Sequence, residues 1–427
     1  MLSRRNFVKV AGIPLVVPAT LLGKSSIPPA AGQGTEKAPA IKSFSVFQAT
    51  GNFHRFVGMN AYDKAPKGIK GTKSIVKVVL ADGTYGIGPV GYSTADEQAL
   101  LKLKPLIGRD PFAFYNWQAE KITGVVESMK EYFYDARYSW FESAVLDAIG
   151  KLRKQPVWSL TGEAQRDGID PYDGTLYFED IANNRDVSII AETAKKSKTD
   201  GYRGIKIKLG RPSKWLPGEA GVQRDIDAFV ALREAVGSNF ILMADANNGY
   251  ANQPGWAIQL LKACAPYQMY FMEELFPDDA AAYRKLREAL LQDNFFVPIA
   301  EGENIRDLAL FDPYMQDGIY NYLQPDMHTC GYSNILAMAK KAESFQHIKV
   351  IPHVWQSQLG LLMSLHASKI RRNIPYVEDS RYFEHAMVSS GYLFQQGQWF
   401  VSNKPGWGVE LAPDYKQFIE GKEVVIS

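Results

Sequence analysis

The sequence predicts an α/β fold: a modified TIM-type (β/α)7β barrel with an α+β capping domain formed by the N-terminal region plus the C-terminal segment. Two observations predict the barrel. Beyond about Pro171, short apolar strands alternate with amphipathic helices, which is the pattern of repeated βα units. In addition, a charged or polar residue follows nearly every one of these strands, as expected where strand ends form a site.

Eight strand candidates occur in this region, and eight parallel strands joined by right-handed crossovers close a barrel. The strand candidates are Asp173–Phe178, Gly204–Leu209, Phe240–Ala244, Met269–Met272, Phe296–Ala300, Ile319–Gln324, Lys349–Pro352 and Pro375–Val377. The helices expected between them include Arg224–Val236, Ala281–Leu291, Asn334–Phe345 and Leu359–Arg371. We therefore place the barrel domain at residues 166–390.

The segment before the barrel has a different pattern. From Ile41 the residues alternate as in strands, and Ala81-Asp82-Gly83-Thr84 supplies a hairpin turn. Helical periodicity follows, most clearly from Trp140 to Leu152. Strands followed by helices indicate an α+β capping domain at residues 41–165. Residues 391–427 return to short strands and Gly/Pro turns, and we expect them to pack on the cap.

Residues 1–40 are predicted to be a signal peptide and linker. Ser3-Arg4-Arg5-Asn6-Phe7-Val8-Lys9 is typical of a twin-arginine export signal, and an apolar stretch from Ala11 to Leu22 follows it. That stretch has about half of the roughly 20 residues that a membrane span needs, so we expect no permanent span. The expected location is the periplasm.

The composition excludes some classes of partner. The formal net charge is only +2 and the basic residues are scattered, so we expect no nucleic-acid partner. The hydrophobic share of 46% and the charged share of 22% are ordinary for a soluble globular protein. Cys264 and Cys330 fall inside predicted barrel units and are expected to be free thiols.

The polar residues after the predicted strands are the candidate site. They are Lys206 and Lys208, Asp245 and Asn247, Glu273, Glu303, Asp326, His353 and Glu378. In a barrel, all strands open at their carboxyl ends on one face, so these side chains are expected to converge. Asp245, Glu273 and Glu303 follow consecutive strands, and buried carboxylates are unfavourable unless they are paired or bind a metal. Three oxygen ligands favour Mg²⁺ over zinc or copper.

Seven short motifs contain these residues, one at each strand end. They are Gly204-Ile205-Lys206-Ile207-Lys208, Ala244-Asp245-Ala246-Asn247, Met272-Glu273-Glu274, Glu301-Gly302-Glu303-Asn304, Gln324-Pro325-Asp326, Pro352-His353 and Val377-Glu378. In this order they resemble the signature of the mandelate racemase subgroup of the enolase superfamily, whose members include acid-sugar dehydratases. The resemblance runs from about Ile41 to the C-terminus.

The resemblance implies roles for individual residues. Asp245, Glu273 and Glu303 correspond to Mg²⁺ ligands, Lys208 to one catalytic base, and the His353–Asp326 dyad to a second. Lys206 and Glu378 correspond to groups that contact the substrate carboxylate. Because Lys208 must be neutral to accept a proton, we expect Lys206 and the metal to lower its pKa. Barrels of this family often associate, so the resemblance also implies a possible homo-oligomer.

The sequence departs from the family pattern at two places. The usual Glu-Glu-Pro is Glu273-Glu274-Leu275 here, which changes the turn but keeps the first carboxylate. About eight residues around Lys214 to Val222 are inserted after the Lys-x-Lys strand, where they are expected to border the mouth of the site.

These residue types suit removal of the proton α to a carboxylate through an enediolate, whose charge Mg²⁺ neutralises. We expect dehydration of an acid sugar to a 2-keto-3-deoxy acid, with His353 protonating the departing β-hydroxyl. Racemisation or epimerisation of a hydroxy acid is the alternative, because two bases face one carbon. A non-catalytic sugar-acid binding protein is a third hypothesis.

Four further residues are candidate substrate contacts: Asn247, His54, Arg55 and His328. His54 and Arg55 are expected in an irregular cap loop, which is where a lid would determine specificity. His328 lies two residues after Asp326 and is equally compatible with an exposed loop position. The identity of the small-molecule carboxylate substrate depends on such loop residues.

Overall fold

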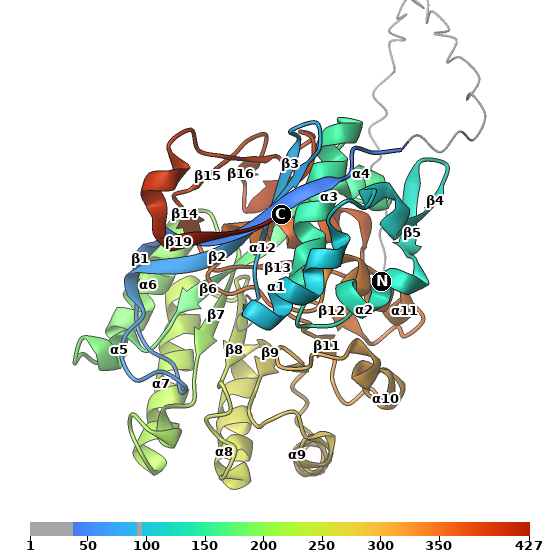
Figure 1. Ribbon diagram of the computed structural model, residues 1–427. Helices are drawn as coiled ribbons and strands as arrows, with labels where there is room; N and C mark the ends of the chain where they lie inside the picture. Colours follow the sequence, from blue (N-terminus) through green and yellow to red (C-terminus); the bar gives the residue numbers. More distant parts are fainter. Residues whose placement is uncertain (1–36, 92–95) are drawn as a thin grey trace, which may run out of the picture. The chain divides into compact units, whose positions relative to one another are not determined.

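In the computed structural model, which describes residues 37–91 and 96–427, eight parallel strands form the centre of the fold (Figure 1). They are β6 (Gly168–Leu176), β7 (Gly204–Lys208), β8 (Ile241–Asp245), β9 (Met269–Glu273), β10 (Ile299–Glu301), β11 (Tyr322–Leu323), β12 (Lys349–Val350) and β13 (Tyr376–Asp379). They pair in the order β12-β11-β10-β9-β8-β7-β6-β13. The predicted α/β architecture with eight parallel strands is confirmed.

The two ends of this strand order, β12 and β13, are not joined by a ladder in the described part of the chain. One backbone hydrogen bond links the neighbouring segments, since the N–H of Val350 donates to the carbonyl of Asn373 at 2.9 Å. The strands therefore follow the order of a barrel, and the segments at its two ends, near β12 and β13, are linked by this backbone hydrogen bond.

Helices alternate with these strands, as the apolar periodicity predicts. They are α5 (Glu179–Ala182), α6 (Ser188–Thr199), α7 (Glu219–Val236), α8 (Pro254–Cys264), α9 (Ala280–Gln292), α10 (Phe311–Asp317), α11 (Tyr332–Ala342) and α12 (Gln358–Ile370). Side-chain caps define some of the boundaries. Asp279 accepts hydrogen bonds from the N–H groups of Ala281 and Ala282 at the start of α9, and Ser357 accepts one from Gly360 at the start of α12.

The alternation of side chains along the strands separates two environments. Ile205 and Ile207 of β7 pack outward into the main apolar core, so Lys206 and Lys208 point to the opposite face. Inside the barrel a separate buried cluster consists of Tyr172, Met243, Phe271, Ala300 and Ile351. Charged residues therefore lie at the carboxyl ends of the strands, next to this buried apolar cluster.

The cap consists of a long antiparallel sheet followed by helices. Its strands are β1 (Ile41–Val57), β2 (Gly68–Leu80) and β3 (Tyr85–Pro89), and the hairpin β4 (Tyr115–Gln118) and β5 (Lys121–Val125) lies apart from them. Its helices are α1 (Glu97–Leu103), α2 (Glu127–Phe133), α3 (Trp140–Arg153) and α4 (Val157–Thr161). The predicted hairpin turn lies between β2 and β3, and Gly83 takes the positive φ of +91° there.

The last part of the chain returns to both the cap and the barrel. Its strands are β14 (Tyr382–Glu384), β15 (Met387–Ser389), β16 (Leu393–Gln395), β17 (Gln398–Phe400), β18 (Val409–Leu411) and β19 (Ile419–Ile426). β14 and β19 pair with β1 of the cap, whereas β17 pairs antiparallel with β6.

Short 3-10 helices occur in the cap, the barrel and the C-terminal segment. They are η1 (Lys104–Leu106), η2 (Pro111–Phe114), η3 (Arg211–Ser213), η4 (Ala265–Tyr267), η5 (Leu308–Leu310) and η6 (Tyr415–Phe418).

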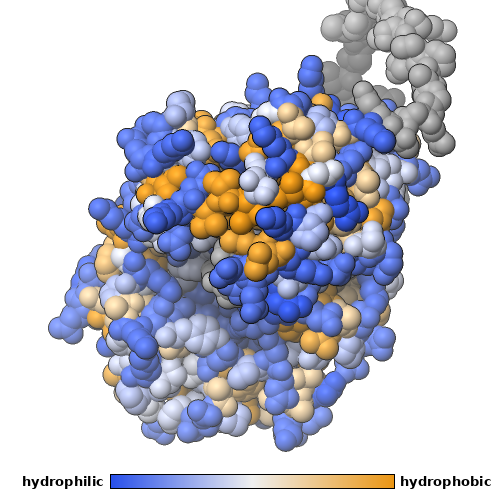
Figure 2. Space-filling view, viewed as in Figure 1, coloured by the Kyte–Doolittle hydropathy of each residue, from blue (hydrophilic) through white to orange (hydrophobic). Residues whose placement is uncertain are grey.

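Apolar side chains gather on the surface over the region where the cap sheet lies (Figure 2). β19 is an outer strand of this sheet and exposes Val424 and Val425, by 45% and 59%.

Cys264 and Cys330 are buried free thiols, as the sequence predicts. Within the described residues, no helix has the length and apolar character needed to cross a bilayer. The predicted signal falls almost wholly on residues 1–36, which lie outside the described residues.

Candidate active site

A cavity of about 320 Å³ opens at the carboxyl ends of the barrel strands, a size near the lower end of the range for small-molecule sites. Predicted site residues line it: Lys208, Asn247, Glu303, Asp326, His353 and Glu378. The loop between β1 and β2 contributes Asn60, Tyr62 and Lys67 to its wall, and Tyr177, Asn304, Arg306 and Trp355 complete it. Cap and barrel therefore share this cavity.

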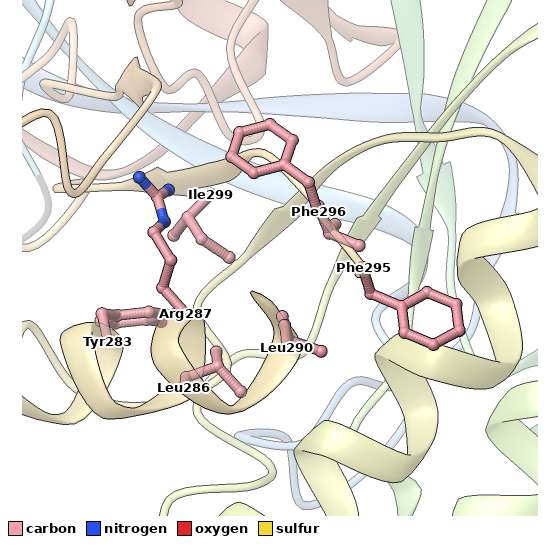
Figure 3. Close-up of a pocket in the computed structure, with 8 residues that line it drawn as sticks. Tyr283, Leu286, Arg287, Leu290, Phe295, Phe296 and Ile299 are labelled. Carbon is pink, nitrogen blue, oxygen red and sulfur yellow. The ribbon is translucent and has the colours of Figure 1, made fainter. Parts of the chain in front are cut away.

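A second hollow, beside α9, does not suit a substrate (Figure 3). Its volume is about 10 Å³, which leaves room for about one water molecule. The walls are mostly apolar, and the guanidinium of Arg287 donates hydrogen bonds to the carbonyls of Gly318 and Ile319. This hollow is a packing feature of the barrel wall.

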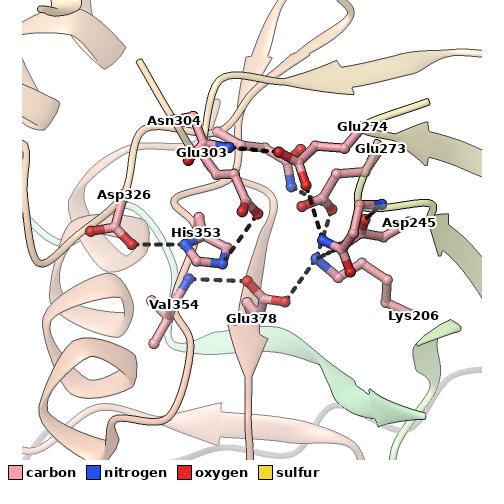
Figure 4. Close-up of polar contacts among 12 residues, drawn as sticks. Lys206, Asp245, Glu273, Glu274, Glu303, Asn304, Asp326, His353, Val354 and Glu378 are labelled. Carbon is pink, nitrogen blue, oxygen red and sulfur yellow. Dashed lines mark hydrogen bonds and ion pairs between the residues drawn. The ribbon is translucent and has the colours of Figure 1, made fainter. Parts of the chain in front are cut away.

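Two lysines stand on one side of β7 because they are two residues apart. Lys206 Nζ lies 2.6 Å from Glu273 Oε2 and 2.8 Å from Glu378 Oε1 (Figure 4). Lys208 Nζ forms an ion pair with Asp245 Oδ2. All five side chains are buried, so each charge is compensated inside the protein.

The pKa of Lys208 differs from the expectation drawn from the sequence. Burial acts to lower this pKa, and Lys206 acts in the same direction, but the Asp245 carboxylate outweighs both and raises it. The expected lowering by Lys206 is confirmed, but the adjacent Asp245 anion stabilises the ammonium form and the net pKa is raised; the expected lowering by the metal stays a prediction.

The predicted dyad is formed. His353 Nδ1 lies 2.7 Å from Asp326 Oδ2, and His353 Nε2 lies 3.3 Å from Glu303 Oε2 on its other side (Figure 4). Asp326 Oδ1 accepts hydrogen bonds from the backbone N–H groups of His328 and Thr329, which fixes the carboxylate. Burial acts to lower the pKa of His353, but Glu303 and Asp326 raise it to about 10.

Lys208 and His353 line the same cavity from different strands. In the strand order, β7 and β12 are separated by β6 and β13 in one direction and by β8 to β11 in the other. The two nitrogen bases therefore approach the cavity from well-separated parts of its wall.

Several carboxylates meet next to these bases. Asp245, Glu274 and Glu303 each offer an oxygen within 4.8 Å of the others, which is close enough to hold one metal ion. Burial and the neighbouring Glu303 and Asp245 carboxylates raise the pKa of Glu274 well above its ordinary value. Burial and Asp245 likewise raise the pKa of Glu273 to about 8. Such a concentration of acids is typical of a cation site.

Glu273, which the sequence assigned to the metal, lies beside this group. Its Oε2 accepts hydrogen bonds from Lys206 and from the amide of Gln324, at 2.6 and 2.9 Å, and its Oε1 is buried without a partner. Its role as a ligand stays a prediction. Sequence reasoning did not select Glu274, although the adjacent Glu-Glu pair was the available signal.

Three of the four candidate substrate contacts, His54, Arg55 and His328, do not line the cavity. His54 and Arg55 belong to the continuous strand β1, not to an irregular loop, and Arg55 donates to Thr175 Oγ1 at 2.9 Å. His328 is fully buried beside Asp326, with its Nδ1 3.6 Å from Asp326 Oδ2. The expected lid position is instead taken by the loop that follows β1. Asn247, the fourth candidate, does line the cavity.

The inserted segment after β7 borders that loop, as expected. Trp215 Nε1 donates to the carbonyl of Asn60 at 2.8 Å, and Lys214 Nζ donates to the carbonyl of Asp63. Asp63 in turn pairs with Lys67 at 2.6 Å. The cap loop is thus held by the barrel insertion at two backbone positions.

The sequence model of the family described as "Enolase C-terminal domain-like" matches residues 189–415, which is more than half of the chain. The chain belongs to this enolase family. The resemblance seen in the strand-end motifs is thereby confirmed. The matched residues include every predicted metal ligand and base of the enolase-type site.

Curated relatives of this enolase-family chain act on acid sugars or their lactones. D-galactarolactone cycloisomerase from Agrobacterium fabrum is 27% identical over 80% of this chain and 89% of the relative. Arabinonate dehydratase from Saccharolobus solfataricus is 25% identical over 78% of this chain and 87% of the relative. The chain is therefore an enzyme of the lyase or racemase kind, with acid-sugar dehydratases among its relatives.

Solved structures agree with the fold. A galacturonate dehydratase from Geobacillus sp., complexed with D-galacturonate and 5-keto-4-deoxy-D-galacturonate, aligns with a TM-score of 0.78 and 25% identity over 92% of this chain and all of its own. A mandelate racemase/muconate lactonizing protein from Geobacillus sp. Y412MC10, complexed with magnesium and tartrate, aligns with a TM-score of 0.77 and 25% identity over 90% of this chain and 96% of its own.

Proposed function

We propose that the chain is a Mg²⁺-dependent dehydratase that converts an acid sugar into a 2-keto-3-deoxy acid. One observation carries the proposal: Lys208 and the His353–Asp326 dyad line the same cavity as Glu303, which is one of three carboxylates close enough together to hold a cation. Neither a sugar-binding protein nor a structural domain requires two bases beside a cation site. Relatives that are named as dehydratases of acid sugars support the choice of reaction.

The donor groups fit a hard divalent cation. Asp245, Glu303 and one glutamate of the Glu273–Glu274 pair would hold Mg²⁺, because all of them offer carboxylate oxygens. Two buried oxygens near this group, Glu273 Oε1 and Asn247 Oδ1, lack a hydrogen-bond partner. When bound, the ion supplies neutralisation of the negative charge that develops on the substrate carboxylate.

The protein groups account for the proton transfers. One base removes the proton from the carbon next to the carboxylate, and His353, which points its Nε2 toward Glu303 and the cavity, donates a proton to the departing β-hydroxyl. Breaking the C–H bond and the C–O bond releases water and leaves an enol, which becomes the 2-keto acid by tautomerisation. Asp326 keeps the imidazole oriented throughout.

The remaining side chains suit a polyhydroxy carboxylate. Lys206 and Glu378 stand 2.8 Å apart, and the Lys206 ammonium would donate a hydrogen bond to the substrate carboxylate, whereas Glu378 would donate one only in its protonated form. Asn60, Asn304 and Trp355 give the outer wall amide groups and one aromatic face, which match the hydroxyls and the C–H surface of a sugar chain.

The test is incubation of the protein with Mg²⁺, D₂O and a panel of aldonic, aldaric and uronic acids, monitored for 2-keto product and for deuterium at the α-carbon. We expect keto product from at least one acid. Deuterium exchange without keto product would favour a racemase or epimerase instead. If the whole panel shows neither, the non-catalytic binding protein is the better interpretation.

We also propose that the chain is exported by the twin-arginine route and acts in the periplasm. The support is the segment Ser3-Arg4-Arg5-Asn6-Phe7-Val8-Lys9 with the short apolar stretch after it. A protein that folds around a metal site before export suits this route, because the route transports folded chains.

A further inference from the structure

The outer wall of the cavity differs in charge from the group of acids and bases at the strand ends. Apart from the site residues predicted from the strand ends, five of the lining residues are neutral: Asn60, Tyr62, Tyr177, Asn304 and Trp355. The other two, Lys67 and Arg306, are cations. The outer wall therefore carries positive charge, and none of its seven lining residues is acidic.

Arg306 is anchored in this wall through one of its nitrogens. Its Nη1 donates hydrogen bonds to the backbone carbonyl of Glu303 at 2.9 Å and to Thr329 Oγ1 at 2.8 Å. Among the described residues, its Nε and Nη2 donate to no other group, and its guanidinium forms no ion pair. These two nitrogens form an edge that can bind a carboxylate through two parallel hydrogen bonds. The side chain is thus held in place while this edge stays available to a ligand.

Lys67 belongs to the loop between β1 and β2 and lies over the ring of Trp355, with its Nζ 5.8 Å from the ring centre. Its ammonium forms an ion pair with Asp63 Oδ1 at 2.6 Å. This pair uses one of the three N–H donors and leaves two for a ligand. Asp63 does not line the cavity, so the lysine is the charge of this pair that faces a bound molecule.

Both cations lie next to the predicted dyad. Thr329, which accepts the hydrogen bond from Arg306, donates one from its hydroxyl to the carboxylate of the dyad at 2.9 Å. Trp355, which lies under the ammonium of Lys67, is two residues after the histidine of the dyad. In the proposed reaction that histidine acts at the β-hydroxyl, so the carbons beyond it extend into the outer part of the cavity, toward these two cations.

We propose that the substrate is an acid sugar with a carboxylate at each end, and that Arg306 and Lys67 bind the carboxylate remote from the reacting carbon. This inference rests on the proposed dehydratase function and narrows its substrate class to aldaric acids. An aldonic acid ends in a hydroxymethyl group instead, which accepts a hydrogen bond but leaves the positive charge of Arg306 without a partner.

The test compares pairs of acids that share their stereocentres and differ only at the last carbon, such as galactaric with galactonic acid and glucaric with gluconic acid, across the hexose configurations. The full-length protein with Mg²⁺ is assayed for 2-keto product from each acid. For the preferred configuration, we expect kcat/KM of the diacid to be at least about tenfold higher, because charge-assisted hydrogen bonds to a carboxylate are stronger than one to a hydroxyl.

Variants of the two cations assign the preference to them. Arg306→Gln should lower kcat/KM for the diacid by about tenfold or more, mainly through KM, and change that for the monoacid by less than about twofold. Arg306→Lys should keep part of the preference, because it retains the charge. Lys67→Gln should reduce the preference as well. Lys64→Gln, at an exposed position of the same loop that does not line the cavity, is the matched control and should retain it.

A monoacid that reacts as well as its diacid, or a preference that Arg306→Gln leaves intact, would overturn the inference while the dehydratase function stands. Absence of keto product from every acid would overturn the proposed function, and this assignment with it. Circular dichroism verifies that each variant is folded. If Arg306→Gln does not fold, Lys67→Gln decides: a diacid preference that falls in this variant supports the proposal, and one that is unchanged refutes it.

Discussion

Trp215 donates its indole N–H to the backbone carbonyl of Asn60 at 2.8 Å, so the insertion after β7 is bonded directly to the loop that covers the cavity. We expect Trp215→Phe to raise KM by roughly two- to tenfold with a smaller change in kcat, which corresponds to the loss of one hydrogen bond. Steady-state kinetics measures both. Trp256→Phe on α8, which is not one of the residues lining the cavity, is the matched control. An unchanged KM would show that this bond does not position the loop.

The His353–Asp326 dyad predicts a strong effect of a nearly isosteric change. Asp326→Asn should reduce kcat by about 10²-fold or more, because an amide neither fixes the imidazole tautomer nor stabilises its charged form. KM should change little. Asp312→Asn, at an exposed ion pair with Lys341, serves as the control. Near-normal turnover in Asp326→Asn would remove the dyad from the mechanism.

Metal removal should lower both activity and stability. We expect chelation to abolish keto-acid formation and Mg²⁺ to restore it. Mg²⁺ at about 100 times its dissociation constant should stabilise the fold by about 2.7 kcal/mol, visible as a rise in Tm. Glu303→Gln should lose most of this rise together with turnover, since it removes a carboxylate of the cation group. If Mg²⁺ still raises the Tm of Glu303→Gln as much as that of the wild type, Glu303 is not a ligand of the ion.

His366 predicts a dependence of stability on acid pH. Its Nδ1 accepts a hydrogen bond from the backbone N–H of Trp158, so the neutral ring donates from Nε2 to the Tyr392 hydroxyl, 2.8 Å away. Burial lowers its pKa from 6.5 to about 3. The unfolded chain therefore binds a proton more readily than the folded one, and stability that is complete above pH 6.5 is lost progressively as the pH falls toward 3.

This contribution is on the order of 2 kcal/mol between pH 6.5 and 5. His366→Gln should have a smaller loss of unfolding free energy over that interval than the wild type, in urea titrations at the two pH values. His347→Gln, at an exposed position, should leave the difference unchanged. An equal pH dependence in all three proteins would contradict the assignment to His366.

Export is testable through the two arginines of the proposed signal. In cells, replacing Arg4 and Arg5 together by lysine should leave the precursor in the cytoplasm, as seen by fractionation. Lys37→Arg outside the motif should have no effect. Periplasmic protein from the double variant would mean that the motif is not used.

Much of the site was predictable because it depends on chemistry placed at regular strand ends. The spacing of apolar strands located β6 to β13, and the alternation along β7 put Lys206 and Lys208 on one face. His353 and Asp326 meet because they follow neighbouring parallel strands in equal register, as the bridge between them shows. Such relationships follow from strand periodicity and sheet order, which a sequence specifies directly.

The residues of the outer cavity wall and the hydrogen-bond partners of the neighbouring glutamates were decided only by the tertiary structure. His54 and Arg55 were expected to face the cavity, but β1 continues through them, and Asn60, Tyr62 and Lys67 of the next loop take that place. Glu274 and Glu273 are indistinguishable as residue types. The positive φ of Glu274 and the ion pair of Glu273 with Lys206 separate them.

The sequence by itself thus determined the eight-stranded α/β fold and the set of acids and bases at its strand ends. The tertiary structure alone decided which carboxylate pairs with which lysine or histidine, and which loop lines the cavity. The physical reason is that period and residue type act locally, whereas the direction of a side chain after a strand depends on one or two backbone dihedrals and on partners brought from distant segments.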